Sequence, residues 1–165
     1  VNMMWPLGNS FTIPQHTNET VLLVGGGVGV APLLYFGKIL KSKGFTVSFL
    51  LAARTASDIL QLEEFKKYGT IYLSTDDGSV GEKGLITQNS VLDRSFDHIY
   101  CCGPMPMMKA VGRLCSERGI DCEVSLENVM ACGIGACLCC VEKTVKGNRC
   151  VCTEGPVFNI DELTW

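Results

Sequence analysis

The sequence predicts an α/β fold, with a five-stranded, doubly wound parallel sheet followed by a small cysteine-rich domain. Three observations support this prediction. Short apolar runs alternate with segments of helical periodicity, which is the pattern of repeated β-α units. A glycine-rich loop, GGGVGVAP, directly follows the first apolar run. Cysteines crowd toward the carboxyl end, beyond the last predicted strand.

The first β-α unit contains the glycine-rich loop. Residues 21–24 are a run of Val and Leu ended by Gly25, which is typical of a buried parallel strand. The loop follows at once, and a helix is expected to begin near Pro32. Gly44 is expected to end that helix, because glycine readily adopts the left-handed conformation of a helix end.

Three more units and a last strand complete the predicted sheet. Each apolar strand is followed by a segment with helical periodicity. Because strands joined by helical crossovers run parallel, we expect one parallel sheet. The predicted strands are 46–53, 70–75, 98–102 and 120–126, and the predicted helices lie around 59–67, 85–92 and 107–118.

Ligands of such sheets bind outside the carboxyl ends of the strands, where the strand order reverses. Glycines there let the backbone approach a pyrophosphate, and the following helix N-terminus favours an anion. The later strand ends bring Arg54, 75–77 and 102–105 to the same edge. Each stretch alone is typical of a connecting loop, but together they predict a dinucleotide pocket. The candidate contact residues are Gly25, Gly26, Gly27, Val28, Gly29, Pro32, Arg54, Thr75, Asp76, Cys102, Gly103, Pro104 and Met105.

The glycine loop departs from the Rossmann fingerprint. Counted from Gly25, the third glycine position is Val30, and Arg54 ends the second strand where an acidic ribose-binding residue is expected. A tight strand-to-helix turn without a ligand is the structural alternative. Arg54 could also accept a 2′-phosphate, so these residues leave NAD and NADP both open.

Cys102, at the end of the fourth predicted strand, has two interpretations. A free cysteine is most often a small buried hydrophobic residue. The position of Cys102 beside Gly103 and Pro104 equally favours packing against a nicotinamide ring. The sequence leaves both interpretations open.

Four cysteines near the carboxyl end have the spacing of a plant-type [2Fe-2S] cluster, C-x4-C-x2-C followed by a distant cysteine. Gly133 and Gly135 lie in the first gap, where the backbone must wrap a small inorganic core. The predicted metal ligands are Cys132, Cys137, Cys140 and Cys152.

A structural zinc site and a set of buried thiols are the alternatives. Zinc sites usually use two C-x2-C-like pairs, whereas here one loop carries three candidates. Cys139 would shorten the second gap to one residue. Spacing alone does not separate Cys150 from Cys152 as the fourth ligand.

The composition and the N-terminus exclude several classes. A net charge of -3 provides no basic surface for nucleic acid. Residues 1–18 lack the basic start and the cleavage site of a secretory signal, so we expect a cytoplasmic protein. Residues 20–37 are uncharged, but their glycines and Pro32 fit a strand, loop and helix better than a membrane span.

A dinucleotide pocket and a [2Fe-2S] cluster in one chain imply a flavin. A nicotinamide exchanges two electrons as hydride, whereas the cluster accepts one at a time, and a flavin can do both. No flavin-binding region is evident in the sequence. We therefore divide the chain into a linker over 1–18, an NAD-binding domain over 19–126 and a [2Fe-2S] cluster domain over 127–165.

Five segments together resemble the electron-transfer subunits of type 1B dihydroorotate dehydrogenase, which are ferredoxin-reductase-like flavoproteins. The resemblance extends over nearly the whole chain from Trp5 onward. It implies GGGVGVAP as the pyrophosphate loop and CGPMP as the nicotinamide-side loop. It also favours Cys152 over Cys150, because the last ligand of the family precedes a GPVF segment. The segments are GGGVGVAPL, TDDGSVGEKGLIT, YCCGPMPMM, MACGIGACLCC and CTEGPVF.

The resemblance also implies cofactors and a partner. Members of the family bind FAD in an N-terminal β-barrel with an R-P-x-S-like motif, which is absent here, and WPLGNSF resembles the exit from that barrel. Electrons would pass from dihydroorotate to FMN on a catalytic partner subunit, then through the cluster and FAD to NAD+, as a step of pyrimidine biosynthesis. We expect a heterotetramer in which this chain is part of an oxidoreductase subunit, inactive alone.

Two rival functions remain open. Electron-transfer subunits of sulfide dehydrogenase, hydrogenase or ferredoxin:NADP reductase resemble the same template, although some of them replace one cysteine with a carboxylate. A non-catalytic nucleotide-binding module with structural zinc is the rival of another class.

Overall fold

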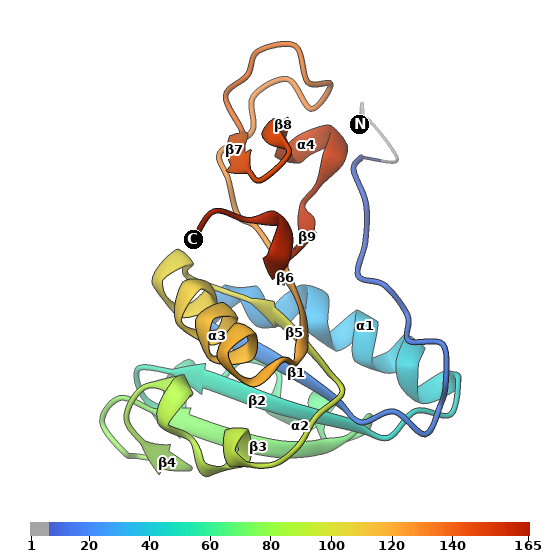
Figure 1. Ribbon diagram of the computed structural model, residues 1–165. Coiled ribbons are helices and arrows are strands. Elements are labelled where there is room, and N and C mark those ends of the chain that lie inside the picture. Colours follow the sequence, from blue (N-terminus) through green and yellow to red (C-terminus); the bar gives the residue numbers. More distant parts are fainter. Residues whose placement is uncertain (1–6) are drawn as a thin grey trace, which may run out of the picture.

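The computed structural model describes residues 7–165, so the expectations that concern Trp5 and Pro6 lie outside the described residues. One large sheet forms the centre, with α1 and α3 packed on its opposite faces (Figure 1). A smaller region with a two-stranded hairpin lies beyond one end of that sheet. The predicted α/β class with a mainly parallel sheet is therefore confirmed.

Strands and helices alternate along the chain until Ser125, except that β4 follows β3 with no helix between them. The large sheet contains β1 (Val21–Gly26), β2 (Val47–Ala53), β3 (Thr70–Thr75), β4 (Glu82–Lys83), β5 (His98–Cys102), β6 (Asp121–Ser125) and β9 (Val157–Asn159). The hairpin consists of β7 (Val141–Thr144) and β8 (Gly147–Cys150). The helices are α1 (Val30–Ser42), α2 (Leu62–Phe65), α3 (Met105–Arg118) and α4 (Val151–Glu154).

The strand order of the large sheet is β4-β3-β2-β1-β5-β6-β9. The chain builds outward from β1 on one side and returns to build from β5 on the other, so the order reverses between β1 and β5. The five predicted strands are all present and parallel. The sequence did not predict β4 or β9, because runs of two and three residues carry no readable periodicity. Strand β9 is antiparallel to β6.

The continuous apolar run of β1 is explained by burial on both faces. Leu22 and Val24 pack in the core beneath α3, and Val21 and Leu23 pack in the core beneath α1. All four are at most 1% exposed. Helices on both faces thus require apolar residues at successive strand positions.

The predicted helices are confirmed where a glycine ends them. Gly44 follows α1 with φ +92°, and Gly119 follows α3 with φ +66°. Helix α1 begins at Val30, so that Pro32 lies in the first turn, where its missing N–H leaves no hydrogen bond unmade.

Two predicted helices are shorter than expected. The helix predicted at 59–67 covers only Leu62–Phe65, because Gln61 before it has the left-handed φ of 54°. The helix predicted at 85–92 is two 3-10 turns separated by Asn89. The Asn89 side chain accepts from the Val91 N–H and donates to the Leu73 carbonyl of β3. These bonds hold the segment against the sheet in place of a regular helix.

The carboxyl-terminal region leaves the sheet and then returns to it. Residues 127–140 contain no helix or strand and lead into the β7–β8 hairpin and α4. Strand β9 then pairs with β6, and its Phe158 is 2% exposed in the core beneath α3. The cysteine-rich region is thereby fastened to the edge of the nucleotide-binding sheet. Within residues 7–165, no helix is both long and apolar enough to cross a membrane.

Candidate functional site: a nucleotide pocket and a cysteine loop

A pocket of about 480 Å³ lies at the carboxyl ends of β1, β2 and β5. It is therefore next to the point where the strand order reverses, as expected for a dinucleotide site in a doubly wound sheet. The residues that line it are Gly26, Gly27, Ala52, Ala53, Arg54, Asp76, Leu85, Ile86, Thr87, Pro104, Pro106, Met107 and Ala110.

The glycine loop passes close to the loop that follows β5. A side chain at Gly29 would place its Cβ 2.6 Å from the carbonyl oxygen of Cys102. A Cβ at Gly27, by contrast, would meet nothing within 4 Å, and Gly27 has a positive φ of 56°. The loop thus turns its backbone toward open space at the N-terminus of α1, where the free amide groups of the first turn favour an anion.

The structure brings five of the thirteen predicted nucleotide residues to the pocket wall, namely Gly26, Gly27, Arg54, Asp76 and Pro104. Arg54 is exposed and forms no ion pair with any residue of the described chain. Its guanidinium is free to meet a ligand. The predicted residues that lie beside the pocket without lining it are Gly25, Val28, Gly29, Pro32, Thr75, Cys102, Gly103 and Met105.

Thr75 is occupied within its own loop. Its side chain is buried, its hydroxyl donates to the Val80 carbonyl at 2.8 Å, and the same hydroxyl accepts from the Val80 N–H at 3.2 Å. Thr75 therefore shapes the loop after β3, which carries Asp76 to the pocket.

The sequence reasoning missed the apolar side of the pocket. Leu85, Ile86 and Thr87 come from the turn after β4, and Met107 and Ala110 come from the first turns of α3. Leu85 is 64% exposed, so its side chain is accessible to a ligand in the pocket. The sequence feature that could have indicated this side is the apolar pair Leu85–Ile86, which directly follows a loop of Asp, Gly and Ser.

Cys102 lies at the end of β5, between the pocket and the start of the cysteine loop. It is 3% exposed, and its Sγ is 3.9 Å from Oε1 of Glu127. Burial, with the Glu127 carboxylate beside it, raises the pKa of Cys102 to about 11. The thiol is therefore neutral near pH 7, and it packs in the core beneath α1.

The first three predicted cluster ligands lie in the irregular loop that follows β6. Within it, the backbone N–H groups of Ile134 and Cys137 point to Sγ of Cys132, at 3.5 and 3.4 Å. These hydrogen bonds lower the pKa of Cys132 to about 6. Gly133 and Gly135 have φ of +71° and +75°, so the glycines allow the turns that aim the amides at sulfur.

The second pair of predicted ligands joins the loop to α4. The N–H of Cys152 donates to Sγ of Cys140 at 3.4 Å, and both side chains are 2% exposed. The N–H of Cys152 lowers the pKa of Cys140, whereas burial raises the pKa of Cys152. Cys140 of the loop and Cys152 of α4, 12 positions later, are thus held together.

The arrangement in pairs fits a binuclear core. The four predicted ligands lie as two pairs, Cys132 with Cys137 and Cys140 with Cys152. In a [2Fe-2S] cluster each iron takes two cysteines, whereas a structural zinc ion needs four ligands around one point. Amides directed at sulfur also favour the thiolate form that binds metal.

Two further cysteines lie near these pairs. Cys139 is exposed, and its backbone N–H donates to Sγ of Cys137 at 3.5 Å. Sγ of Cys150 is 3.7 Å from the Gly135 carbonyl oxygen. Burial and the neighbouring thiols raise the pKa of Cys150, whereas the pKa values of Cys132 and Cys140 are lowered, so Cys132 and Cys140 ionise more readily than Cys150.

Comparison with protein families decides the relationship. Residues 23–113 match the family model of the oxidoreductase NAD-binding domain, which is more than half of the chain. The chain belongs to this family. Residues 127–164 of this NAD-binding oxidoreductase match the iron-sulfur cluster binding domain of dihydroorotate dehydrogenase B. These two domain types correspond to the two predicted cofactors, NAD(H) and an iron-sulfur cluster.

Individual relatives confirm the resemblance stated from the motifs. The electron transfer subunit of dihydroorotate dehydrogenase B (NAD(+)) from Clostridium acetobutylicum is 41% identical over 99% of this chain and 64% of its own length. The corresponding subunit from Fusobacterium nucleatum is 41% identical over 96% of this chain and 63% of its own length. The chain therefore spans just under two thirds of these relatives.

A solved structure supports the fold over the full chain. The NADH-dependent reduced ferredoxin-NADP oxidoreductase, a system of flavin-based electron bifurcation, superposes with a TM-score of 0.87 at 34% identity. The match covers 100% of this chain and 60% of that one. The cysteine region is thus part of a shared arrangement with the nucleotide-binding sheet.

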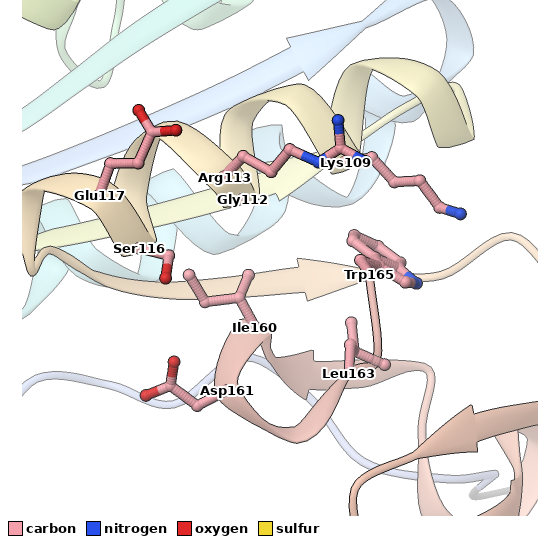
Figure 2. A pocket seen from close by; sticks show the side chains of 9 residues that line it. All are labelled: Lys109, Gly112, Arg113, Ser116, Glu117, Ile160, Asp161, Leu163 and Trp165. Atoms are coloured by element: carbon pink, nitrogen blue, oxygen red, sulfur yellow. The ribbon is translucent and has the colours of Figure 1, made fainter.

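A second pocket, of about 450 Å³, lies on the outer side of α3 (Figure 2). The Lys109 ammonium lies 5.6 Å from the centre of the Trp165 ring at one end of it, and Asp161 lies near Ser116 at the other end. The pocket contains none of the predicted nucleotide or metal residues. Its lining mixes both charge signs, so it offers no clear preference for a nucleotide phosphate.

Proposed function

We propose that this chain relays electrons between NAD(H) and a partner subunit that oxidises dihydroorotate to orotate. One observation carries the proposal: a dinucleotide pocket and a loop with paired thiols share one edge of the sheet. The loop starts directly after β6, whose carboxyl end lies beside that of β5. Its first residue, Glu127, lies 3.9 Å from Cys102 at the pocket. The named function of the relatives from Clostridium acetobutylicum and Fusobacterium nucleatum supports the same proposal.

In the proposed nucleotide site, the backbone from Gly25 to Gly29 and the first turn of α1 bind the pyrophosphate. Arg54 and Asp76, which follow β2 and β3, face the adenosine half. The loop from Gly103 to Met105 borders the nicotinamide half, with the neutral thiol of Cys102 beneath it. The apolar lining from Leu85 and Met107 excludes water from the bound dinucleotide.

In the proposed metal site, Cys132, Cys137, Cys140 and Cys152 hold a [2Fe-2S] cluster. When bound, this cluster takes up and releases one electron at a time. The N–H groups of Ile134, Cys137 and Cys152 donate to sulfur atoms of the ligands. Such bonds spread the negative charge of the thiolates, so they favour the reduced state and tune its potential.

The proposed electron relay also requires flavins, which we assign to the full-length subunit and to its catalytic partner. A flavin must divide the hydride pair, because the nicotinamide and the cluster exchange different numbers of electrons. We propose FAD for that role in the full-length subunit, and FMN in the catalytic partner. We further propose a heterotetrameric, cytoplasmic assembly, with this chain inactive without flavin and partner.

The test is dihydroorotate-dependent reduction of NAD+ by the full-length subunit combined with an FMN-containing dihydroorotate-oxidising protein. We expect NADH formation that requires both proteins, and Cys152→Ser should abolish it. Failure of the wild-type pair to form NADH, with cluster and flavins present, would refute the proposed substrate.

The 34% identity to the ferredoxin-NADP system keeps one other candidate function in view. Arg54 without an ionic partner at the pocket would also suit the 2′-phosphate of NADP. Titration with NAD(H) and NADP(H) separates the two, and reduction of NADP+ by reduced ferredoxin would favour this second function.

A further inference from the structure

We infer that Asn9 is a positioning residue for Cys152. The inference rests on the proposed function, because it takes Cys152 as a cluster ligand. It begins from a contact between distant parts of the chain. Asn9 lies against residues 154–157, which come 145 to 148 positions later in the sequence.

Asn9 makes four hydrogen bonds to that later segment. Its backbone N–H donates to the Gly155 carbonyl at 2.6 Å. Its side-chain amide donates to the carbonyls of Glu154 and Val157, at 3.1 and 2.8 Å. Its Oδ1 accepts from the Val157 N–H at 2.9 Å. Asparagine is suited to this role because its amide both donates and accepts.

The segment that Asn9 holds is the continuation of α4, the turn of helix that carries Cys152. Glu154, whose carbonyl accepts from Asn9, is the last residue of α4. The N–H of Gly155 closes the same turn by donating to the Val151 carbonyl at 3.1 Å. Cys152 is therefore fixed from one side by its N–H bond to Cys140 and from the other by Asn9.

Gly8 allows the close approach of the two segments. Its φ is +62°, and a Cβ at this position would lie 1.9 Å from the carbonyl oxygen of Gly155. No side chain could be accommodated there without moving the backbone. The pair Gly8–Asn9 is thus shaped to lie on the segment after α4.

The residues after Asn9 are anchored to the nucleotide-binding sheet. Phe11 is buried against Phe36 of α1 and Tyr100 of β5, with ring centroids 5.2 and 5.4 Å away. The Tyr100 hydroxyl donates to the Thr12 carbonyl at 2.6 Å. Asn9 therefore fixes Cys152 relative to the sheet, and not only relative to the neighbouring loop.

The experiment compares cluster retention in four variants of the chain, reconstituted anaerobically. Asn9→Asp keeps the size and the acceptor but replaces the two amide donor bonds with repulsion between oxygens. Asn9→Ser is a milder second variant. Ser10→Ala is the local control, because Ser10 makes no side-chain hydrogen bond within residues 7–165. Thr20→Val controls for stability, because it removes the 2.8 Å bond from the Thr20 hydroxyl to the Asp97 carboxylate, directly before β1.

The measurements are the rate of cluster loss to a ferrous-iron chelator, the electron paramagnetic resonance spectrum of the reduced cluster, and Cys152 alkylation in cluster-free protein. For Asn9→Asp we expect cluster loss about tenfold faster than wild type, a changed spectrum and faster alkylation. Affinity for NAD(H) should be unchanged, which verifies the fold. Ser10→Ala should match wild type in all three measurements. Thr20→Val should also match wild type once its rate of cluster loss is corrected for any loss of thermal stability.

Each outcome bears on a defined claim. The faster cluster loss in Asn9→Asp could be no larger than its loss of thermal stability accounts for, with Thr20→Val as the reference. In that case Asn9 is only structural and the inference fails. If Asn9→Asp and Asn9→Ser both match Ser10→Ala in all three measurements, the inference also fails, while the proposed function stands. If wild type binds no cluster, the proposed function itself fails.

Discussion

The nucleotide-binding sheet and the cysteine loop are held in different ways. In the sheet, β1 is buried on both faces and paired on both sides, and its position is fixed by packing. In residues 127–140 there is no helix or strand, and Val129 and Leu138 are 77% and 64% exposed. The bonds that give the loop its shape are mainly amide contacts to sulfur.

The two sites therefore obtain their order from different sources. The nucleotide pocket is formed by strand ends and helix starts, so it should exist without a ligand. The cysteine loop has little packing of its own, so its order should depend on what the sulfurs bind. Strand β9, the Gly8–Asn9 segment and the buried side chains of Cys140 and Cys152 extend the rigidity of the sheet toward it.

The largest effect is expected at the fourth ligand. Cys152→Ser should abolish or distort the [2Fe-2S] cluster, because it removes one sulfur of the Cys140–Cys152 pair. Cys150→Ser should leave the visible spectrum intact. Spectra of both variants after anaerobic reconstitution check this, and the reverse pattern would assign the fourth ligand to Cys150. NAD(H) affinity should be the same in both variants if the two regions are held independently.

Next in size is the strand that joins the regions. Phe158→Ala should lower the free energy of unfolding by about 3–5 kcal/mol, because a large aromatic side chain is removed from a close-packed core. Leu138→Ala is the matched apolar control in the exposed loop and should change stability by less than about 0.5 kcal/mol. Chemical denaturation of the two variants measures both values. Equal effects would mean that the loop is packed as tightly as the sheet edge.

A smaller effect is expected in the glycine loop. Gly29→Ala should weaken NAD(H) binding by about tenfold, since the new Cβ would lie 2.6 Å from the Cys102 carbonyl oxygen and would displace the loop. Val28→Ala, at a 74% exposed neighbour, is the control. Fluorescence titration with NADH checks the comparison. Unchanged affinity in Gly29→Ala would remove this loop from the binding site.

The contrast also explains what could be predicted from the sequence. The parallel strands were predictable because burial on two faces demands apolar runs, as in residues 21–24. Gly44 marked a helix end for a conformational reason that applies in any context. Strand β9 was not predictable, because three residues pair with β6 only once the chain has folded back. For the same reason, sequence spacing could not reveal that Asn9 contacts residues near Cys152.

The two candidate sites also differ in how far the sequence alone could predict them. The spacing of the cysteines indicated Cys132, Cys137 and Cys140, and the family resemblance added Cys152. The fold holds these four residues in two pairs. For the nucleotide pocket, Arg54 and Asp76 could be predicted because they follow strand ends. Leu85 and Ala110 line the pocket only because α3 and the turn after β4 pack over the sheet. Local patterns predict residues on one loop, whereas a pocket wall made by several elements requires the tertiary structure.

The smallest effect concerns the thiol at the boundary of the two regions. Cys102 should stay neutral and unreactive to iodoacetamide at pH 9, because burial raises its pKa to about 11. An unfolded thiol, with a pKa of about 8.5, is about three quarters ionised there. The stability due to this shift is fully present below the unfolded pKa and is lost as pH rises toward 11. Mass spectrometry of alkylated peptides across this range checks the order; Cys102 reacting before Cys139 would contradict it.

The most direct test of the central claim is metal and sulfide analysis, with a visible spectrum, of the anaerobically prepared chain. If two cysteine pairs hold a [2Fe-2S] core, the chain should be brown and should contain about two iron atoms and two acid-labile sulfides. A colourless protein with one zinc and no sulfide would contradict the account.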